Sequence, residues 1–354
     1  MNCDEVFMSR CFALALKGSG NVSPNPMVGA VIVKNGKIIG EGYHRKYGCE
    51  HAEVNAVNSV NNKKDIEGST IYVSLEPCSH YGKTPPCAKL LVENKIKKCI
   101  ICNLDPNPKV DGGGIKMLKD AGIEIETNVL QRQGRFINRR FFCFQEKYRP
   151  YIILKYAQSL DGYMDINAYC TKNSERKPYW ITNDALKVFT HKLRADNDAF
   201  FVGANTVIND NPKLNIRYFA GNNPLRLVYD RDLSIPTEKN IFDGIQKTII
   251  FNDKKYEKLN DNTLLVKINN PKLYLNDIIH YLYNQGINSL VVEGGKRTLE
   301  MFLDNNLWDE AYVLTGNQIF KQGIKSPAID TDLLKSTRMV SDNRINFYCN
   351  NNAY

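Results

Sequence analysis

The sequence has no uninterrupted hydrophobic run near the roughly 18 residues that a transmembrane helix requires, so we expect no membrane span. Residues 1–5 carry two acidic side chains and no basic one ahead of a short apolar segment, which disfavours a secretory signal peptide. The hydrophobic content of 43% and the charged content of 24% are ordinary for a soluble globular chain. We therefore expect a cytoplasmic protein.

A dinucleotide-binding fingerprint of the G-x-G-x-x-G type is also missing after the predicted strands, so a Rossmann fold has no support. There is no arginine-rich tail and no basic stripe interleaved with aromatic residues, although the net charge is +9. The lysines are dispersed along the chain. This pattern favours a solvated surface and a small phosphorylated substrate, and we expect no nucleic-acid partner.

The ten cysteines do not indicate a disulfide framework, because the chain is long and shows no secretory signal. Most lie in apolar segments, such as Cys99 and Cys102 among isoleucines and Cys143 between phenylalanines. We predict that these are reduced core residues, since free cysteine packs as a small hydrophobic side chain. Cys78 and Cys87 have a context that indicates a different role.

The length of 354 residues predicts two domains. The first begins with an amphipathic helix over 4–17 that places Val6 on its apolar side, and the turn Asn35-Gly36 then predicts a hairpin. The alternation of strands and helices that follows predicts a mostly parallel sheet with helices on both faces. The expected elements are the hairpin strands 27–33 and 37–42, further strands over 71–75, 98–102 and 123–125, helices over 51–60, 87–94 and 112–121, and a helical connection over 130–147.

Arg149-Pro150 interrupts this pattern, so we place the boundary near residue 148 and predict domains over 1–147 and 148–354. The second half again alternates strands and helices, which predicts a second α/β domain. Its expected elements are strands over 151–157, 199–202, 225–229, 247–251, 289–292 and 310–314, a helix over 275–284 and another that starts at Gly295.

One motif in the first half offers the ligands of a catalytic metal site. His51-Ala52-Glu53 begins a predicted helix, Cys78 follows a buried strand, and Cys87 begins the next helix. One imidazole and two thiolates can hold zinc and leave a fourth position for water, whose pKa the metal lowers toward 7. Glu53 is not needed as a ligand and could carry protons between that water and a leaving amine.

The alternative to a catalytic site is a structural zinc site, which normally has four protein ligands. His80 is a possible fourth ligand. The glutamate of the H-x-E motif has no purpose in a structural site, and the same motif occurs in zinc deaminases. Hydrolytic zinc chemistry is therefore the favoured interpretation.

The motif over 51–53 and the segment 75–87, in which eight residues separate the two cysteines, closely resemble the riboflavin-biosynthesis pyrimidine deaminases. The segments 25–29 and 105–108 match that family as well. The resemblance implies a cytidine-deaminase-like α/β/α domain that binds zinc, and a diaminopyrimidinone substrate with a phosphoribosylamino group. It also implies pocket roles for Asn25 at the pyrimidine, for His44, His80, Lys83 and Thr84 near the ribose phosphate, and for Asp105 and Asn107 at the rim.

The second half contains a Gly294-Gly295 turn between a buried strand and a helix. Such a turn could bind a phosphate, although such turns are common without a ligand. Several segments occur in the order expected for one family: Lys155, 159–162, 180–182, 193–195, 202–207, 210–212 and 292–295. With them the second half resembles the reductase half of the bifunctional riboflavin deaminase/reductase family. The resemblance implies a dihydrofolate-reductase-like α/β fold that uses NADPH.

The reaction implied by this resemblance reduces an open-chain ribose carbonyl to a ribityl alcohol. Lys155 and Glu293 are our candidates for substrate orientation and proton supply, and Arg194 and Arg217 for the substrate phosphate. The remaining expected contacts are Leu214 and Glu293 at the substrate, and Ala157, Trp180, Thr206, Asp210, Gly294 and Gly295 at the cofactor. Arg231 follows a strand end, and we hypothesise that it binds the 2′-phosphate of NADPH.

Two features depart from the reductase pattern. The segment 163–179 is longer than usual, and Pro178 stands where a serine commonly contacts the substrate. Proline supplies neither a hydroxyl nor an N–H donor. The departure is compatible with an altered substrate clamp or with an impaired reductase half.

Two other functions stay open from the residues alone. A nucleic-acid deaminase with an accessory domain would use the positive charge to hold RNA, and its binding would be sensitive to salt. A non-enzymatic zinc-binding module would keep its properties after Glu53→Ala. For the favoured bifunctional enzyme, the resemblance also implies a homo-oligomer formed through the reductase domain.

Overall fold

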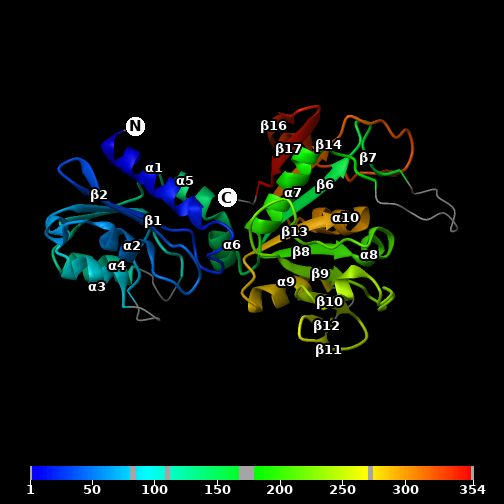
Figure 1. Cartoon of the computed structure of the whole chain (residues 1–354), viewed down its shortest axis with the longest axis horizontal. Helices are drawn as coiled ribbons and strands as arrows, with labels where there is room; N and C mark the ends of the chain where they lie inside the picture. The colour runs from blue at the N-terminus through cyan, green and yellow to red at the C-terminus, as the bar shows by residue number, and fades with distance from the viewer. Residues whose placement is uncertain (1, 80–84, 108–111, 167–178, 270–273, 352–354) are drawn as a thin grey trace. The chain divides into compact units, whose positions relative to one another are not determined.

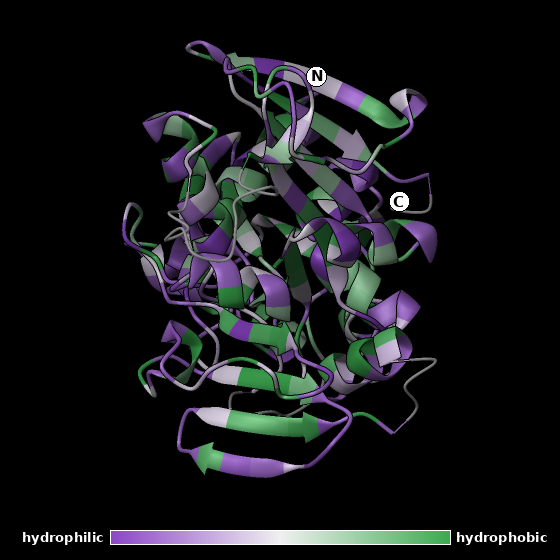
Figure 2. Ribbon diagram, turned by 90° about the vertical axis from the view of Figure 1, so that its right-hand side faces the viewer, coloured by the Kyte–Doolittle hydropathy of each residue, from purple (hydrophilic) through white to green (hydrophobic). Residues whose placement is uncertain are grey.

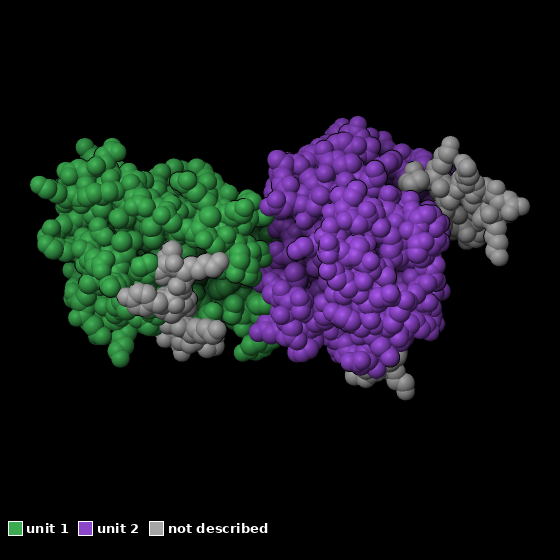
Figure 3. Space-filling model, turned by 60° about the horizontal axis from the view of Figure 1, so that its bottom comes forward, with its two compact units in different colours: residues 1–148 green, residues 149–354 purple. Residues whose placement is uncertain are grey.

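The computed structural model describes residues 2–79, 85–107, 112–166, 179–269 and 274–351. The chain divides into two compact units, Met1–Tyr148 and Arg149–Tyr354 (Figure 3). Among the described residues, no helix is both long enough and apolar enough to cross a membrane.

Unit 1 is built around a sheet with the strand order β2-β1-β3-β4-β5 (Figure 1). β1 pairs antiparallel with β2 and β3, whereas β3, β4 and β5 are parallel, as expected for the part that follows the hairpin. The strands are β1 (Gly29–Lys34), β2 (Lys37–Tyr43), β3 (Thr70–Leu75), β4 (Lys98–Asn103) and β5 (Glu124–Thr127). The helices are α1 (Cys3–Ala15), α2 (Ala52–Ser59), α3 (Cys87–Glu93), α4 (Gly113–Asp120), α5 (Gln131–Ile137) and α6 (Arg139–Lys147).

Both faces of this sheet are covered, because successive side chains of a strand point to opposite sides. Ala30 and Ile32 of β1 pack into one apolar cluster with α2 and α3, and Val31 and Val33 pack into another with α1. The prediction for Val6 was wrong, since 52% of it is exposed. The buried residues of α1 are instead Met8, Cys11, Phe12, Leu14 and Ala15.

Unit 2 contains a larger sheet with the order β11-β12-β10-β9-β8-β13-β6-β14-β17-β16. The strands from β12 to β14 are parallel in this order, and antiparallel pairs close both edges. The strands are β6 (Tyr151–Gln158), β8 (Ala199–Gly203), β9 (Leu225–Tyr229), β10 (Thr248–Asn252), β11 (Glu257–Asn260), β12 (Thr263–Lys267), β13 (Ser289–Gly294), β14 (Glu310–Thr315), β16 (Leu334–Val340) and β17 (Asn343–Cys349). A separate pair comprises β7 (Tyr163–Asp165) and β15 (Ile324–Lys325), and the helices are α7 (Asp184–Asp196), α8 (Ala204–Asp210), α9 (Tyr274–Asn284) and α10 (Lys296–Asp304).

The edge strands of unit 2 were not predicted, because they lack a buried face. Every residue of β11 is exposed, and all of β16 except its last residue is exposed. In Figure 2 the ribbon of β11, the lowest strand, is mostly hydrophilic, whereas the neighbouring β12 is mostly hydrophobic. The helix α7 was also missed, although Asn183 caps it and accepts a hydrogen bond from the backbone N–H of Leu186.

A buried ion pair holds the beginning of β6 to the beginning of β14. The carboxylate of Asp309 is fully buried and accepts hydrogen bonds from both terminal nitrogens of Arg149, at 2.6 and 2.7 Å. It also accepts a hydrogen bond from the backbone N–H of Ile152 at 2.8 Å. All the contacts named here lie within unit 2, so this pair fixes the first strand of the unit to its neighbour.

Replacing Asp309 by alanine is expected to destabilise unit 2 by about 3–5 kcal/mol, because the mostly buried guanidinium of Arg149 loses its partner. Urea unfolding followed by circular dichroism measures the change. The control is Asp261→Ala, which removes a surface partner of Lys258 and is expected to change stability by less than about 1 kcal/mol. Equal effects of the two substitutions would contradict the role assigned to Asp309.

Candidate functional site

Three side chains of unit 1 converge beside the carboxyl end of β3. His51 is the N-cap of α2, Cys78 follows β3, and Cys87 is the first residue of α3. The Sγ atoms of Cys78 and Cys87 lie 3.6 and 3.4 Å from Nδ1 of His51. All three possible ligand atoms lie within 4.8 Å of one another.

The spacing of these atoms fits a tetrahedral zinc ion. Zn–S and Zn–N bonds of about 2.3 and 2.1 Å place a nitrogen and a sulfur ligand about 3.6 Å apart. The two N–S distances in the site match this value. Three ligands from the described residues leave one position for water, which is the arrangement of catalytic rather than structural zinc. His80, the possible fourth ligand, lies outside the described residues.

The surroundings of Cys78 favour its thiolate form. A hydrogen bond from the Cys87 thiol, together with contacts from His51 and from the backbone N–H of Cys87, lowers the pKa of Cys78 to about 4. The donor of that backbone contact is the first residue of α3, where helix N–H groups are free. Metal binding requires deprotonated cysteine, so the fold prepares this ligand.

Glu53 lies in the first turn of α2, one residue after the start of the helix. Only 3% of it is exposed, and burial, with the charge of Cys78, raises its pKa to about 7. The position two residues from a ligand places a carboxyl group next to the metal site without making it a ligand.

Asn25 and His44 extend the site on the side of His51. The amide Nδ2 of Asn25 lies 3.1 Å from Nε2 of His44, and Nδ1 of His44 lies 3.0 Å from the carbonyl oxygen of Glu50. The rings of His44 and His51 meet edge to face with centroids 5.5 Å apart. The structure therefore brings Asn25 and His44 together with the metal ligand His51.

Asp105 and Asn107 follow β4, the parallel neighbour of β3, so they emerge at the same sheet edge as Cys78. The backbone N–H of Asn107 donates to Asp105 Oδ1 at 2.9 Å. The buried carboxylate of Glu76 was missed by sequence reasoning. It accepts hydrogen bonds at 3.4 Å from the backbone N–H groups of Asp105 and Ile115, so it holds this loop and the start of α4 beside the metal site.

The approach of α4 to the metal site requires a glycine. A Cβ added at Gly114 would lie 1.9 Å from the carbonyl oxygen of Pro77, the residue before the ligand Cys78. The sequence contains this signal as a run of three glycines over 112–114. The predicted substrate contacts His80, Lys83 and Thr84 lie outside the described residues.

A second site occupies a cavity of about 1300 Å³ in unit 2. Drug-sized ligands use pockets of roughly 300–1000 Å³, so this cavity has room for a large cofactor and a substrate together. All the substrate-binding, catalytic and cofactor-binding residues predicted for the second domain line this cavity, except Gly294. These are Lys155, Ala157, Trp180, Arg194, Thr206, Asp210, Leu214, Arg217, Arg231, Glu293 and Gly295.

Three buried charges form the centre of this cavity. In the parallel register, Leu154 of β6 pairs with Val292 of β13, so the next residues, Lys155 and Glu293, stand side by side. Lys155 Nζ lies 3.4 Å from Glu293 Oε1, and an Arg194 terminal nitrogen lies 2.9 Å from Glu293 Oε2. Two cations therefore share one carboxylate, which leaves an excess of positive charge for an anionic ligand.

The protonation states in this cluster depend on burial and on the neighbouring charges. Burial opposes the ionisation of Glu293, but the charges of Arg194 and Lys155 outweigh it and lower the pKa of Glu293 to about 2. Burial lowers the pKa of Lys155, and Glu293 offsets part of that effect. A lysine with a lowered pKa gives up a proton more readily than an exposed one.

His191 of α7 is a cavity residue that sequence reasoning missed. Its Nδ1 accepts a hydrogen bond from the backbone N–H of Arg217 at 2.9 Å, and its ring meets that of Tyr218 edge to face. Burial and the nearby charges of Arg194 and Arg217 lower the pKa of His191 to about 4. A single histidine in an unpredicted helix gave no signal in the sequence, because its partner is distant in the chain.

The turn that leads from β13 into α10 also contributes to the cavity, through Gly295. The backbone N–H of Gly295 donates to Thr206 Oγ1 at 2.7 Å, which joins this turn to α8. Gly295 and the first residues of α10, Lys296, Arg297 and Thr298, line the cavity. Gly294 is not a lining residue, but it precedes the turn with a φ of 115°, a conformation that favours glycine.

Two of the residues predicted to contact the cofactor, Trp180 and Arg231, already have protein partners. Trp180 is 55% exposed and lies under the ammonium of Lys187, 4.5 Å from the ring centroid. Arg231 lines the cavity, with its Nε 3.0 Å from Asp232 Oδ2. Pro178 lies outside the described residues.

The lining residues fit NADPH, which is negatively charged. Helix N-termini bind phosphate through their free N–H groups, and the N-terminus of α10 opens on the cavity with Lys296 and Arg297. Nε of Arg194 is buried and has no hydrogen-bond partner among the described residues. A bound anion would supply that missing acceptor.

Comparisons with known proteins agree with this two-site architecture. Residues 1–103 match the family described as the cytidine and deoxycytidylate deaminase zinc-binding region, and residues 150–323 match the RibD C-terminal domain. Riboflavin biosynthesis protein RibD of Aquifex aeolicus is 39% identical over 326 residues, covering 91% of this chain and 89% of that protein. The corresponding protein of Bacillus amyloliquefaciens is 38% identical and covers 87% of this chain and 83% of its own length.

Solved structures give the same result. The crystal structure of a diaminohydroxyphosphoribosylaminopyrimidine deaminase/5-amino-6-(5-phosphoribosylamino)uracil reductase from Thermotoga maritima has a TM-score of 0.86 and 33% identity, and covers 98% of both chains. Acinetobacter baumannii RibD has a TM-score of 0.84 and 28% identity, also over 98% of both chains.

The fold and the two sites define a bifunctional enzyme with a zinc-binding deaminase domain and a reductase domain. More specifically, the chain belongs to the family of riboflavin biosynthesis protein RibD. The predicted cytidine-deaminase-like and dihydrofolate-reductase-like folds are confirmed, and zinc and NADPH fit the two domains.

We predict that the purified protein contains one zinc ion per chain and that Cys87→Ser lowers the zinc content roughly tenfold or more after dialysis, because a thiolate ligand is lost. Elemental analysis by mass spectrometry measures the content. Cys143→Ala, at a buried cysteine outside the ligand cluster, is the matched control and is expected to retain the metal. Full zinc occupancy in the Cys87→Ser protein would refute the assigned ligand set.

Proposed function

We propose that this enzyme catalyses two successive steps of riboflavin biosynthesis. The first is hydrolytic deamination of 2,5-diamino-6-ribosylamino-4(3H)-pyrimidinone 5′-phosphate. The second is NADPH-dependent reduction of the ribosyl group of 5-amino-6-(5-phosphoribosylamino)uracil to ribityl. The observation that carries the proposal is that one chain holds both the metal-ligand cluster beside buried Glu53 and the charged cavity around Glu293.

In the deaminase half, zinc held by His51, Cys78 and Cys87 would make water acidic enough to supply a nucleophile near neutral pH. The carboxyl group of Glu53 takes the proton from the attacking water and delivers it to the leaving amine, which departs as ammonia. Burial supports this role, because it keeps bulk water away from the carboxyl group.

The side chains around the metal cluster make the substrate contacts of the deaminase half. Asn25 binds the pyrimidine, and its contact with His44 supports a shared pocket for the base and the ribose phosphate. The same role at the phosphate is proposed for His80, Lys83 and Thr84. Asp105 and Asn107 form the rim, where Glu76 fixes their loop.

In the reductase half, bound NADPH would supply the hydride that reduces the ribose carbonyl carbon. Lys155 Nζ supplies the proton for the oxygen that becomes the alcohol, and Glu293 holds the ammonium and orients the substrate. Arg194 and Arg217 bind the substrate phosphate, which the excess positive charge and the unpartnered Nε of Arg194 support. Leu214 completes the substrate contact.

The cofactor contacts proposed for the reductase half lie along the part of the cavity that includes α8 and α10. The nicotinamide nucleotide occupies the region lined by Ala157, Trp180, Thr206, Asp210 and Gly295, with Gly294 shaping the turn. We propose residues 1–147 and 148–354 as the deaminase and reductase domains, and a cytoplasmic homo-oligomer, formed through the reductase domain, that acts on small phosphorylated pyrimidines rather than on nucleic acids.

The alternative with an impaired reductase half is the less favoured one. The charged cluster of Lys155, Arg194 and Glu293 and the large cavity around it support a working site. Each of these contacts is made by residues other than Pro178. We therefore expect the proline to alter substrate affinity rather than to abolish reduction.

We predict that Glu53→Gln and Glu293→Gln separate the two activities. Glu53→Gln is expected to lower ammonia release by roughly 10²–10⁴-fold, because the proton carrier is lost. It should leave NADPH oxidation unchanged when the uracil intermediate is supplied directly. Glu293→Gln is expected to lower NADPH oxidation and to leave ammonia release unchanged, because it removes the charge that holds Lys155. Ammonia and NADPH are measured separately in each reaction.

The retained activity of each variant shows that the other unit is intact, and circular dichroism of each variant is the control for folding. Zinc analysis of Glu53→Gln supplies a further control, because the metal should stay bound. If Glu53→Gln released ammonia at the wild-type rate, the first half of the proposal would fail. If Glu293→Gln oxidised NADPH normally, the second half would fail.

For the cofactor, we predict that Arg231→Ala lowers the preference for NADPH over NADH roughly tenfold, because a charge-assisted contact with the 2′-phosphate is lost. The preference is the ratio of kcat/KM values for the two cofactors. Lys258→Ala, a charge removal on the exposed strand β11, is the matched control. An unchanged preference in Arg231→Ala would exclude this contact.

A further inference from the structure

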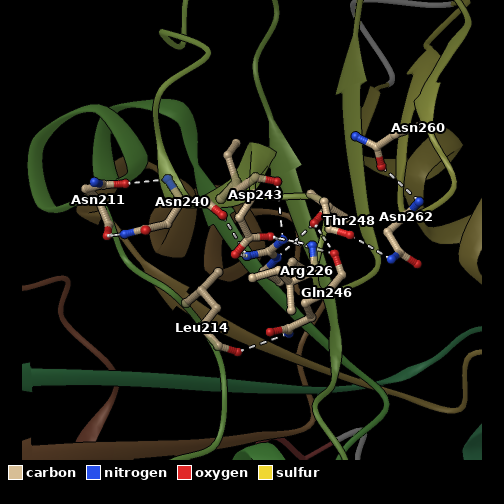
Figure 4. Close-up of polar contacts among 12 residues, drawn as sticks. Asn211, Leu214, Arg226, Asn240, Asp243, Gln246, Thr248, Asn260 and Asn262 are labelled. Carbon is tan, nitrogen blue, oxygen red and sulfur yellow. Dashed lines mark hydrogen bonds and ion pairs between the residues drawn. The ribbon is translucent and has the colours of Figure 1, made fainter.

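Arg226 of β9 is an arginine whose side chain is almost completely buried, away from the cavity lining. Its guanidinium makes a bidentate ion pair with Asp243, with distances of 2.7 and 3.2 Å. Nε donates to Thr248 Oγ1 at 2.8 Å. Figure 4 shows these groups gathered around the guanidinium.

The remaining hydrogen bonds of Arg226 hold the loop between β9 and β10. Its terminal nitrogens donate to the carbonyl oxygens of Asn240 at 2.9 Å, Ile241 at 3.3 Å and Gln246 at 3.0 Å. One planar group thus fixes the backbone of the segment 240–246 at three points. A lysine could not do this, because its ammonium lacks the five donors of a guanidinium.

The segment 240–246 in turn holds a wall of the reductase cavity, residues 211–214. Asn240 exchanges two hydrogen bonds with Asn211, in which its backbone N–H donates to Asn211 Oδ1 at 2.7 Å and its Nδ2 donates to the Asn211 carbonyl at 2.6 Å. Gln246 Nε2 donates to the carbonyl oxygen of Leu214 at 3.3 Å. Figure 4 shows both links on the side of Arg226 away from Asn262.

This wall needs such support because one of its residues, Leu214, adopts a backbone conformation that is unfavourable for its side chain. Asn211 has a φ of 42° and Leu214 a φ of 52°, both in the left-handed region. A leucine rarely adopts this conformation unless the surrounding structure enforces it. Asn211 and Leu214 both line the cavity, and Leu214 precedes the phosphate-binding candidate Arg217 by three residues.

We propose that Arg226 is a positioning residue of the reductase site, which acts through Asn240 and Gln246 to fix the wall 211–214 against the substrate. The inference rests on the reductase reaction proposed above. It extends that reaction to a residue that never touches the substrate. Its consequence is that substrate affinity depends on the polar network that holds the wall.

The test compares two substitutions in the same network. Gln246→Met keeps the size of the side chain but removes the Nε2 donor to the carbonyl oxygens of Leu214 and Pro224. Asn262→Leu is the matched control, because Asn262 Nδ2 donates to the carbonyl oxygen of Gly244 in the same loop and has no link to the wall. Arg226→Lys, which retains the charge, is a third variant. Reductase KM and kcat, deaminase activity and the thermal midpoint are measured for each.

We expect Gln246→Met to raise KM for the uracil ribotide by roughly three- to tenfold, the effect of losing a buried hydrogen bond in the wall. Its thermal midpoint should fall by about as much as that of Asn262→Leu, whose KM should match the wild type. Arg226→Lys should raise KM at least as much as Gln246→Met. Deaminase activity should be unchanged in all three, since the network lies within unit 2.

A wild-type KM in Gln246→Met, or an equal rise in Asn262→Leu, would show that the network contributes only to stability and would overturn the proposal. This outcome differs from a failure of the proposed function. That failure would appear as a wild-type enzyme that does not oxidise NADPH with the uracil ribotide.

Discussion

The alignment of parallel strands is the constraint on which both sites depend. Parallel strands end at a common edge, so residues that follow them gather there although they are far apart in sequence. In unit 1 this edge brings the loop after β4 beside Cys78, at the end of β3. In unit 2 the register of β6 and β13 places Lys155 next to Glu293, and β8 adds the turn into α8. Two different chemistries are thus built by the same geometric rule.

Buried charge is the second feature that the two units share. Isolated buried charges are costly, so each must be paired or hydrogen-bonded. Glu76 is held by backbone N–H groups, Glu293 by two cations, and Arg226 by Asp243 and three carbonyl oxygens. In each case the partners lie in segments of the chain other than the one that carries the charged residue. These groups therefore fix loops relative to strands, and this rigidity keeps the ligands and the substrate contacts in place.

The zinc site could be predicted from the sequence because its ligands and Glu53 form short, distinctive motifs, at the starts of two helices and after the end of a strand. Most buried strands were predictable for the same local reason, but the partly buried strands β12 and β17 were not predicted. The roles of His191, Glu76 and Arg226 could not be predicted, since each depends on partners that only the tertiary fold brings near. The exposed strands β11 and β16 carry no alternation of buried and exposed residues, and Val6 followed the apolar pattern of α1 without being buried.

The most direct test of the two-site account is a reaction of the wild-type protein with the diaminopyrimidinone ribotide, with and without NADPH. The account predicts one equivalent of ammonia in both reactions, and oxidation of one equivalent of NADPH only after deamination. Ammonia release without any NADPH oxidation would contradict the assignment of the cavity in unit 2. The absence of ammonia from a fully zinc-loaded protein would contradict the central claim about His51, Cys78, Cys87 and Glu53.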